Sequence, residues 1–394
     1  MEGKKELTEQ QGFTKKTWVR LAAVILLICV AAGAFAYGIA MLISANDGYQ
    51  EIECTASVAN CSSEFIFTYN LGVSGMSPTA EKKAVTNLYN EKAAYYYRLF
   101  HPSETFDDVV NVAAINISAN KTISVPSELY SALEKAVSDE CRSIYLGPVY
   151  AYYDTLFSSS YDEDASTWDP ARNAEMRAEF DKTVAFASND GDIRLELKGN
   201  GKVTLVVSKE YLAFADEVGI TSFIDFYWMK NAFIADFLAK DMTDAGYKYG
   251  VISSRDGFIR NFDASDLEYV YDVFDEKNGD AVAMGKLIYR GVAAVCSLHT
   301  FALDDVDKTY SYEYADGTRV TRYISIEDAL PHGQRGNVVT FSVTRGCADM
   351  LIDLLPYYLS ENVAEFASDG VGALYSDGGS ISEKPLEGFT YYKN

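Results

Sequence analysis

Apolar and polar residues alternate along some stretches of the chain and recur at helical spacing along others. Residues 64–72 place Phe65, Phe67 and Tyr69 on one side of the backbone, which predicts a strand with one buried face. Residues 78–99 begin with Pro-Thr and then repeat apolar side chains every three or four positions, which predicts a helix. The chain is therefore expected to contain both strands and helices.

Residues 123–157 combine both patterns. A short apolar strand ends at Val125, and Pro126 then stands where the first turn of a helix tolerates a missing N–H. Apolar residues at helical spacing follow, and Gly147-Pro148 predicts a loop before an aromatic run. We therefore expect a strand, a helix, a Gly-Pro loop and an aromatic helix.

Five later stretches carry equally clear patterns. The predicted elements are a hairpin at 192–207, a largely buried helix at 220–238, strands at 249–253 and 287–297, and a strand, turn and helix at 338–355. Hydrophobic residues make up 48% of the chain, which is enough for a sizeable core.

An uncharged apolar run of 23 residues, 21–43, precedes this body. As a helix it would extend about 35 Å, enough to cross a hydrocarbon core of about 30 Å. Basic residues flank only its N-terminal side, which predicts a single-pass anchor in the cell membrane with a cytoplasmic N-terminus. The alternative is a cleavable signal peptide with Ala34-Phe35-Ala36 as its cleavage site.

The anchor divides the chain into a cytoplasmic tail (1–20), a transmembrane helix (21–43), a polar linker (44–63) and an extracytoplasmic domain (64–394). Cys54 and Cys61 lie seven positions apart in the linker, which makes them candidates for a small disulfide loop outside the cell.

The composition excludes several classes of partner and site. Lys and Arg number 34 against 57 Asp and Glu, so the formal net charge is −23 and the body should repel nucleic acid. The three histidines lie far apart, and no phosphate-binding loop, dinucleotide fingerprint or nucleophile elbow is present in the sequence. Any enzymatic activity must therefore be argued from a family resemblance.

The order of these elements resembles that of the FAD:protein FMN transferases of the ApbE type, and this resemblance implies an α+β fold with mixed sheet and helices. Residues 123–157 resemble the cofactor-side segment of that family, and the resemblance extends over about 64–358. Ser103-Glu104 partly matches the family pattern Pro-x-Ser-Glu, although a helix cap with a following acid would explain the same two residues.

A glycine-rich motif of the family corresponds to residues 224–236. The motif reads Leu-Asp-Leu-Gly-Gly-Ile-Ala-Lys-Gly-Tyr-Ala-x-Asp, and its outer acids are present as Asp225 and Asp236. Its two adjacent glycines are replaced by Tyr227 and Trp228. Since glycine lets the backbone approach a phosphate closely, these rings predict a nucleotide pocket that is partly filled.

The resemblance also implies a set of cofactor contacts. The family binds FAD and holds Mg²⁺ through an Asp and a Thr four residues later; here Asp349 matches the Asp, and Asp353 replaces the Thr. Carboxylates at i and i+4 share a helix face and suit a hard cation, but a solvated acidic face is the alternative. The flavin contacts implied by resemblance are Glu104, Gly147, Pro148, Asp225 and Ser297.

Three functional hypotheses follow. The first is a membrane-tethered, Mg²⁺-dependent enzyme that passes FMN from FAD to a hydroxyl group of a partner flavoprotein, as the resemblance implies. The second is a non-catalytic descendant, serving as a flavin-binding or assembly subunit beside surface electron-transfer proteins. The third is an unrelated α+β sensor on a single anchor. The loss of motifs at several separate places favours the second.

Overall fold

The computed structural model describes residues 48–54, 64–139, 141–158, 167, 169–303, 307–377 and 379–394. The predicted cytoplasmic tail and transmembrane helix lie outside these residues, as does Cys61 of the predicted disulfide loop. None of the helices in the described ranges is long and apolar enough to cross a bilayer. The anchor and the disulfide stay predictions.

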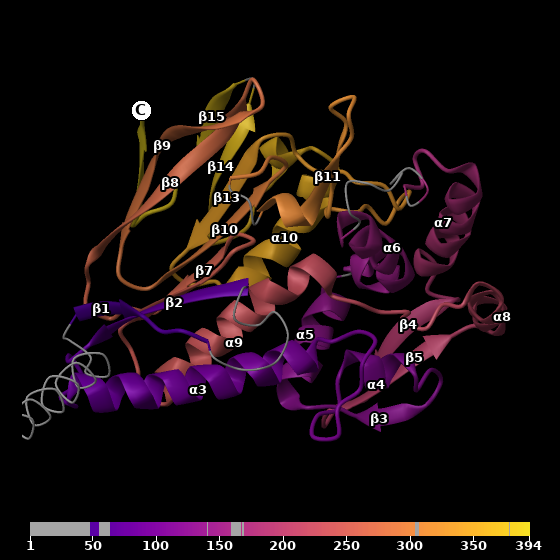
Figure 1. Ribbon diagram of the computed structural model, residues 1–394, viewed down its shortest axis with the longest axis horizontal. Coiled ribbons are helices and arrows are strands. Elements are labelled where there is room, and N and C mark those ends of the chain that lie inside the picture. Colours follow the sequence, from indigo (N-terminus) through magenta and orange to yellow (C-terminus); the bar gives the residue numbers. More distant parts are fainter. Residues whose placement is uncertain are drawn as a thin grey trace, which may run out of the picture.

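An eight-stranded antiparallel sheet forms the centre of the fold, in the order β1-β2-β6-β7-β10-β13-β14-β15 (Figure 1). Its strands are β1 (Gly48–Glu51), β2 (Phe65–Leu71), β6 (Gly250–Ser254), β7 (Phe258–Asn261), β10 (Ala293–His299), β13 (Asn337–Ser342), β14 (Gly372–Asp377) and β15 (Ser380–Lys384).

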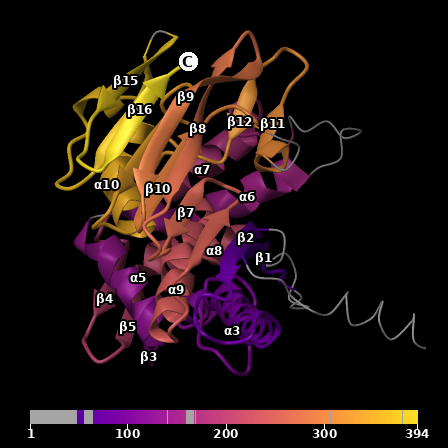
Figure 2. The same ribbon diagram turned by 90° about the vertical axis from the view of Figure 1, so that its left-hand side faces the viewer.

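The middle strands β10 and β13 are covered on both faces, and every one of their residues is buried. On one face, Ala294 and Cys296 belong to the main core, which includes helices α9 (Lys230–Asp244) and α10 (Cys347–Leu359). On the other face, Val295 packs in a second core beneath a three-stranded sheet. Figure 2 shows the strands of that sheet side by side: β16 (Phe389–Lys393), β9 (Asp280–Arg290) and β8 (Glu268–Lys277).

The remaining elements surround this centre (Figure 1). Helix α3 (Pro78–Leu99) packs against α9, and a smaller sheet in the order β3-β5-β4 lies at one end of the molecule. The small strands are β3 (Thr122–Ser124), β5 (Lys202–Val207), β4 (Ile193–Leu197), β11 (Ser311–Glu313) and β12 (Arg319–Thr321). The other α-helices are α4 (Val112–Asn116), α5 (Ser127–Ser138), α6 (Gly147–Ser158), α7 (Ala174–Ala187) and α8 (Lys209–Val218). Single 3₁₀ turns form η1 (Arg142–Leu146), η3 (Tyr227–Met229), η4 (Asp307–Tyr310) and η5 (Val363–Glu365).

Most elements predicted from periodicity are confirmed. Helix α3 has the predicted bounds, β4 and β5 form the predicted hairpin, and β13 leads through a turn into α10 as expected. The mixed arrangement confirms the α+β prediction.

The predicted helix at 220–238 is wrong in its first half, because α9 begins only at Lys230. Tertiary hydrogen bonds hold the preceding segment in a non-helical path. The backbone N–H groups of Phe223 and Ile224 donate to Asn116 Oδ1, at 3.1 and 2.9 Å, and that of Asp225 donates to the Ile144 carbonyl at 2.8 Å. Local apolar periodicity could not reveal these distant partners.

Two further predictions need correction. The single strand expected at 287–297 is two strands, because the chain turns at Gly291, whose φ is 65°, and passes from the outer sheet to the central one. Gly147 and Pro148 do not form a loop but begin α6, where Pro is tolerated in the first turn. A Cβ on Gly147 would lie 2.6 Å from the Ser222 carbonyl oxygen, so close approach of two segments requires glycine there.

Candidate functional site

A cavity of about 330 Å³ opens where the start of α9 meets the end of α3, helix α6 and the turn between β6 and β7. This volume lies at the lower end of the range for small-molecule sites, about 300–1,000 Å³. We call it the Asp225 cavity. Its charged lining residues are Glu64, Asp154, Asp225, Lys230, Asp256 and Arg322.

Asp225 is the one predicted flavin-contacting residue that lines this cavity. Its side chain is buried and accepts a hydrogen bond from the backbone N–H of Tyr227 at 2.7 Å. Burial raises the pKa of Asp225 to about 7, because a carboxylate is poorly solvated there, while this hydrogen bond and Lys230 oppose the shift. The carboxyl group therefore titrates near neutral pH.

Tyr227 and Trp228, on the two glycine positions of the resembled motif, both line the cavity. Tyr227 has a φ of 43°, in the left-handed region that glycine adopts without strain. Its ring stacks on Tyr150 at 4.6 Å between centroids, and its hydroxyl bonds the Asp154 side chain. At this position the chain combines a backbone conformation typical of glycine with an aromatic side chain.

Lys230, in the first turn of α9, is the first of two cations in the cavity. Its Nζ lies 3.7 Å from Glu64 Oε1 and 5.8 Å from the centroid of the Tyr97 ring. Burial alone would lower the pKa of Lys230, but Glu64 and Asp225 outweigh it and raise the pKa overall. The ammonium group therefore stays charged.

Arg322 is the second cation, and its side chain is only 7% exposed. Its Nη1 lies 3.7 Å from Asp256 Oδ2, and its guanidinium lies over the Tyr310 ring at 4.4 Å. Asn231 Nδ2 donates to the same Asp256 oxygen at 3.0 Å. These contacts join α9, the β6–β7 turn and the segment after β12 into one wall.

The other predicted flavin contacts do not line the cavity, and their roles stay predictions. Glu104 has a side chain that is 66% exposed, and it lies just beyond the lining residue Ser103. Gly147 and Pro148 are buried at the start of α6, whose later residue Asp154 does reach the cavity. Ser297 is buried in β10, where its Oγ donates to Asn337 at 3.0 Å.

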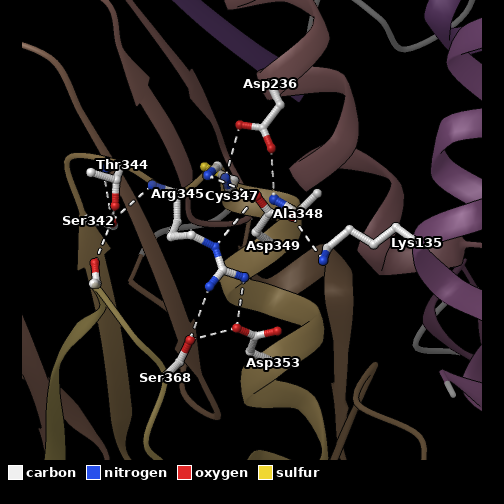
Figure 3. Close-up of polar contacts among 12 residues, drawn as sticks. Lys135, Asp236, Ser342, Thr344, Arg345, Cys347, Ala348, Asp349, Asp353 and Ser368 are labelled. Atoms are coloured by element: carbon white, nitrogen blue, oxygen red, sulfur yellow. Dashed lines mark hydrogen bonds and ion pairs between the residues drawn. The ribbon is translucent and has the colours of Figure 1, made fainter. Parts of the chain in front are cut away.

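The predicted metal-binding pair lies at the start of α10, and neither residue lines the cavity (Figure 3). Asp349 Oδ1 lies 2.9 Å from Lys135 Nζ, and its Oδ2 lies 3.7 Å from Arg345. Asp353 accepts from Arg345 Nη2 at 2.9 Å and from Ser368 Oγ at 2.6 Å. Both carboxylates are therefore occupied by side chains of the protein.

This arrangement does not fit Mg²⁺ as it stands. A hard cation needs several oxygen ligands, and here Lys135 and Arg345 already supply positive charge to the same carboxylates. Across the described residues, no group of three or more His, Cys, Asp and Glu side chains is placed to hold a metal. The outer acid Asp236 also has another role: it accepts the backbone N–H groups of Cys347 and Ala348, both at 2.9 Å, and so caps α10.

Several charged residues of the cavity were not among the predicted site residues, namely Lys230, Asp256 and Arg322. Lys230 lies within the segment 224–236 that corresponds to the glycine-rich motif of the resembled family, which is the signal that could have identified it. Asp154 had no such signal, because it stands on an aromatic helix with nothing local to mark it.

Comparisons with known proteins bear on the fold. No protein-family model matches the chain, and no curated protein matches its sequence. The ApbE protein of Thermotoga maritima is similar with a TM-score of 0.59 and 13% identity, over 86% of this chain and 97% of that one. The flavin transferase ApbE from Vibrio cholerae is similar with a TM-score of 0.55 and 11% identity, over 88% of this chain and 97% of that one. The apo form of the Pseudomonas stutzeri flavinyl transferase ApbE is similar with a TM-score of 0.51 and 12% identity, over 82% of this chain and 91% of that one.

Identities of 11–13% limit this likeness to the path of the backbone. The same order of elements was expected from the sequence, and the altered motifs agree with so low an identity. The chain has the fold of the ApbE flavin transferases.

Proposed function

We propose that this protein is a non-catalytic ApbE-like protein that binds a small ligand in the Asp225 cavity. In this proposal it works outside the cell, tethered by residues 21–43, and has lost the transfer of FMN from FAD. The fold supports descent from a flavin-handling scaffold, and the cavity supports continued ligand binding.

The observation that carries this proposal is Tyr227. Its φ of 43° is the kind of backbone conformation that glycine permits, and its ring is fixed by stacking on Tyr150. A phosphate that approached the backbone at this point would meet the ring instead. A pocket filled in this way favours a changed ligand over retained FAD chemistry.

The ion pairs at the start of α10 support the same view. Catalysis in the resembled family rests on a metal that stabilises phosphate charge, and Asp349 is tied to Lys135 and Arg345 instead. The second hypothesis from the sequence, a binding or assembly subunit, therefore agrees best with the site. A role beside a partner flavoprotein is a further part of the proposal.

The test is an assay for AMP release from FAD. The body from residue 48 onward is purified, its bound flavin is measured, and FAD with Mg²⁺ is then supplied. We expect no AMP above the level without protein. AMP release that needs Asp349 would overturn the proposal and favour the transferase.

A matched pair of variants tests the part played by the Tyr227 ring. Tyr227→Gly relieves the positive φ and opens the cavity, so it should increase FMN affinity by about tenfold or more. Asn200→Gly is the control, because Asn200 also has a positive φ of 51° but stands in the exposed turn between β4 and β5. Equal FMN affinity of both variants would contradict the proposal that the Tyr227 ring fills the flavin side of the cavity.

A further inference from the structure

We propose that the Asp225 cavity binds a protonated organic amine, because its acids outnumber its bases and two residues of its lining carry buried acceptor atoms without donors in the described ranges. This inference rests on the proposed binding function and specifies the class of ligand.

The charged side chains of the cavity lining favour a cationic ligand. Glu64, Asp154, Asp225 and Asp256 line the cavity, and among the described residues the lysine and arginine side chains of its lining are Lys230 and Arg322. Each of these two bases has its own acid at 3.7 Å, Glu64 for Lys230 and Asp256 for Arg322. Asp154 and Asp225 remain in excess, so the ionised cavity attracts a cation.

His101 also lines the cavity and does not change this balance. Burial lowers the pKa of His101 below its usual value, so the ring is neutral at neutral pH. The groups that face Asp225 are Lys230 from α9, Asp154 from α6 and the Tyr227 N–H. Burial also raises the pKa of Asp154. When Asp154 and Asp225 are both ionised, the lining carries two negative charges more than positive ones.

Two residues of the lining have hydrogen-bond acceptors that receive no donor from the described part of the chain. Asp256 and Asn231 are 2% and 4% exposed, and among the described residues neither Asp256 Oδ1 nor Asn231 Oδ1 has a donor. The amide orientation of Asn231 is fixed, because its Nδ2 must face the Asp256 carboxylate, to which it donates at 3.0 Å. Two neighbouring acceptors without donors match an ammonium group, which carries up to three N–H donors.

Aromatic side chains in the cavity lining also suit a cation. Tyr97, Phe157, Tyr227, Trp228 and Tyr310 line the cavity, and the Lys230 and Arg322 cations already lie over the Tyr97 and Tyr310 rings. Aromatic faces attract ammonium ions, and the attraction is stronger where water is excluded.

The same features disfavour a flavin phosphate. A phosphate group brings negative charge and acceptors to a cavity that already has an excess of both. The positive charges of Lys230 and Arg322 are already balanced by Glu64 and Asp256, so the lining has no excess positive charge to offer a phosphate.

The test uses three probes of nearly equal size and shape that differ in charge: phenethylamine, phenethyl alcohol and phenylacetate. Binding to the purified body is measured by calorimetry, at a pH above the Asp225 pKa of about 7. We expect phenethylamine to bind at least about tenfold more tightly than the alcohol, and phenylacetate to bind most weakly. Equal affinities, or tighter binding of phenylacetate, would overturn the inference.

Variants locate the binding. Asp225→Asn keeps an acceptor for the Tyr227 N–H and should weaken phenethylamine about tenfold or more without affecting the alcohol. Asp256→Asn is a second variant, and circular dichroism checks that both are folded. Asp244→Asn is the control, because Asp244 lies on the same helix with a side chain 62% exposed, outside the cavity. Equal weakening by all three would mean a general effect of net charge and would contradict a site in the cavity.

FMN and FAD titrations separate this inference from the proposed function. If FMN binds and phenethylamine does not, the amine assignment fails while a binding function stands. If FAD yields AMP, the proposed function fails, whatever the amine result. If no probe binds, the amine assignment is wrong.

Discussion

At the scale of single residues, the site is governed by a carboxyl group in a place that solvates its charge poorly. Asp225 is 7% exposed, and its position is fixed by the Tyr227 N–H and by its own backbone bond to Ile144. Folding therefore works against ionisation of this group. Such a residue suits a site for a cation, because a bound cationic ligand offsets the free energy lost when the carboxylate is buried.

Asp225→Asn should change how stability depends on pH. The pKa of Asp225 is raised from 3.8 to about 7, so between these values the folded protein keeps a proton that the unfolded chain has lost. The Asp225 contribution to stability is thus lost as pH rises from about 4 to 7, by up to about 4 kcal/mol. The variant should match the original protein near pH 4 and be more stable above about pH 7.

Urea unfolding across this pH range measures the effect, with Asp244→Asn as the control for loss of one exposed charge. Lys230 keeps Glu64 as its partner in the variant, so no cation is left alone. A variant that is less stable than the original at every pH would mean that Asp225 is ionised and stabilising in the folded protein.

At the scale of elements, the start of α10 is stabilised by side chains from other parts of the chain. Asp236 on α9 accepts two of its backbone N–H groups, and Lys135 reaches Asp349 from α5 (Figure 3). Negative charge at a helix N-terminus is favourable, and Lys135 and Arg345 balance it. The pair that resembles a metal site is here a junction between helices.

This junction predicts that Mg²⁺ does not stabilise the protein. The melting temperature of the body should be the same with Mg²⁺ and with a chelator, because ligand binding to the folded state alone would raise it. Lys135→Met should cost less than about 1 kcal/mol, since Asp349 is 40% exposed and solvent screens the pair. A rise in melting temperature with Mg²⁺ that disappears in Asp349→Asn would instead support the predicted metal site.

At the scale of the whole molecule, the fold brings distant segments to one cavity. Glu64 directly precedes β2, Asp154 lies on α6, Lys230 begins α9, and Arg322 follows β12. The central sheet is covered by helices on one face and by the β16-β9-β8 sheet on the other, which leaves the cavity at the ends of the elements. Ligand sites in folded domains commonly lie where elements end.

The predicted anchor gives a test at this scale. The full-length chain should stay with the membrane fraction after washing with high salt and alkali and should be released by detergent, because an apolar helix of 23 residues is held by hydrophobic transfer. The control begins at residue 48 and should be recovered in solution. If cleavage occurs after Ala36 instead, mass spectrometry of the mature protein will find its N-terminus there, and the protein will be released without detergent.

The sequence by itself determined most elements and little of the site. Periodicity identified α3, the β4–β5 hairpin and the β13–α10 unit, because their patterns depend on nearby residues. The order of elements was enough to suggest the ApbE-like fold, and Asp225 was found because it lies within a recognisable motif.

Only the tertiary structure decided which charges share the cavity. The late start of α9 depends on Asn116, more than a hundred positions away, and the role of Asp349 depends on Lys135 from another helix. Such contacts leave no local periodicity, because hydrogen bonds and ion pairs depend on distance in space. The sequence shows which residues are charged, but burial and neighbours decide which carboxylates are paired, which are protonated and which face a ligand.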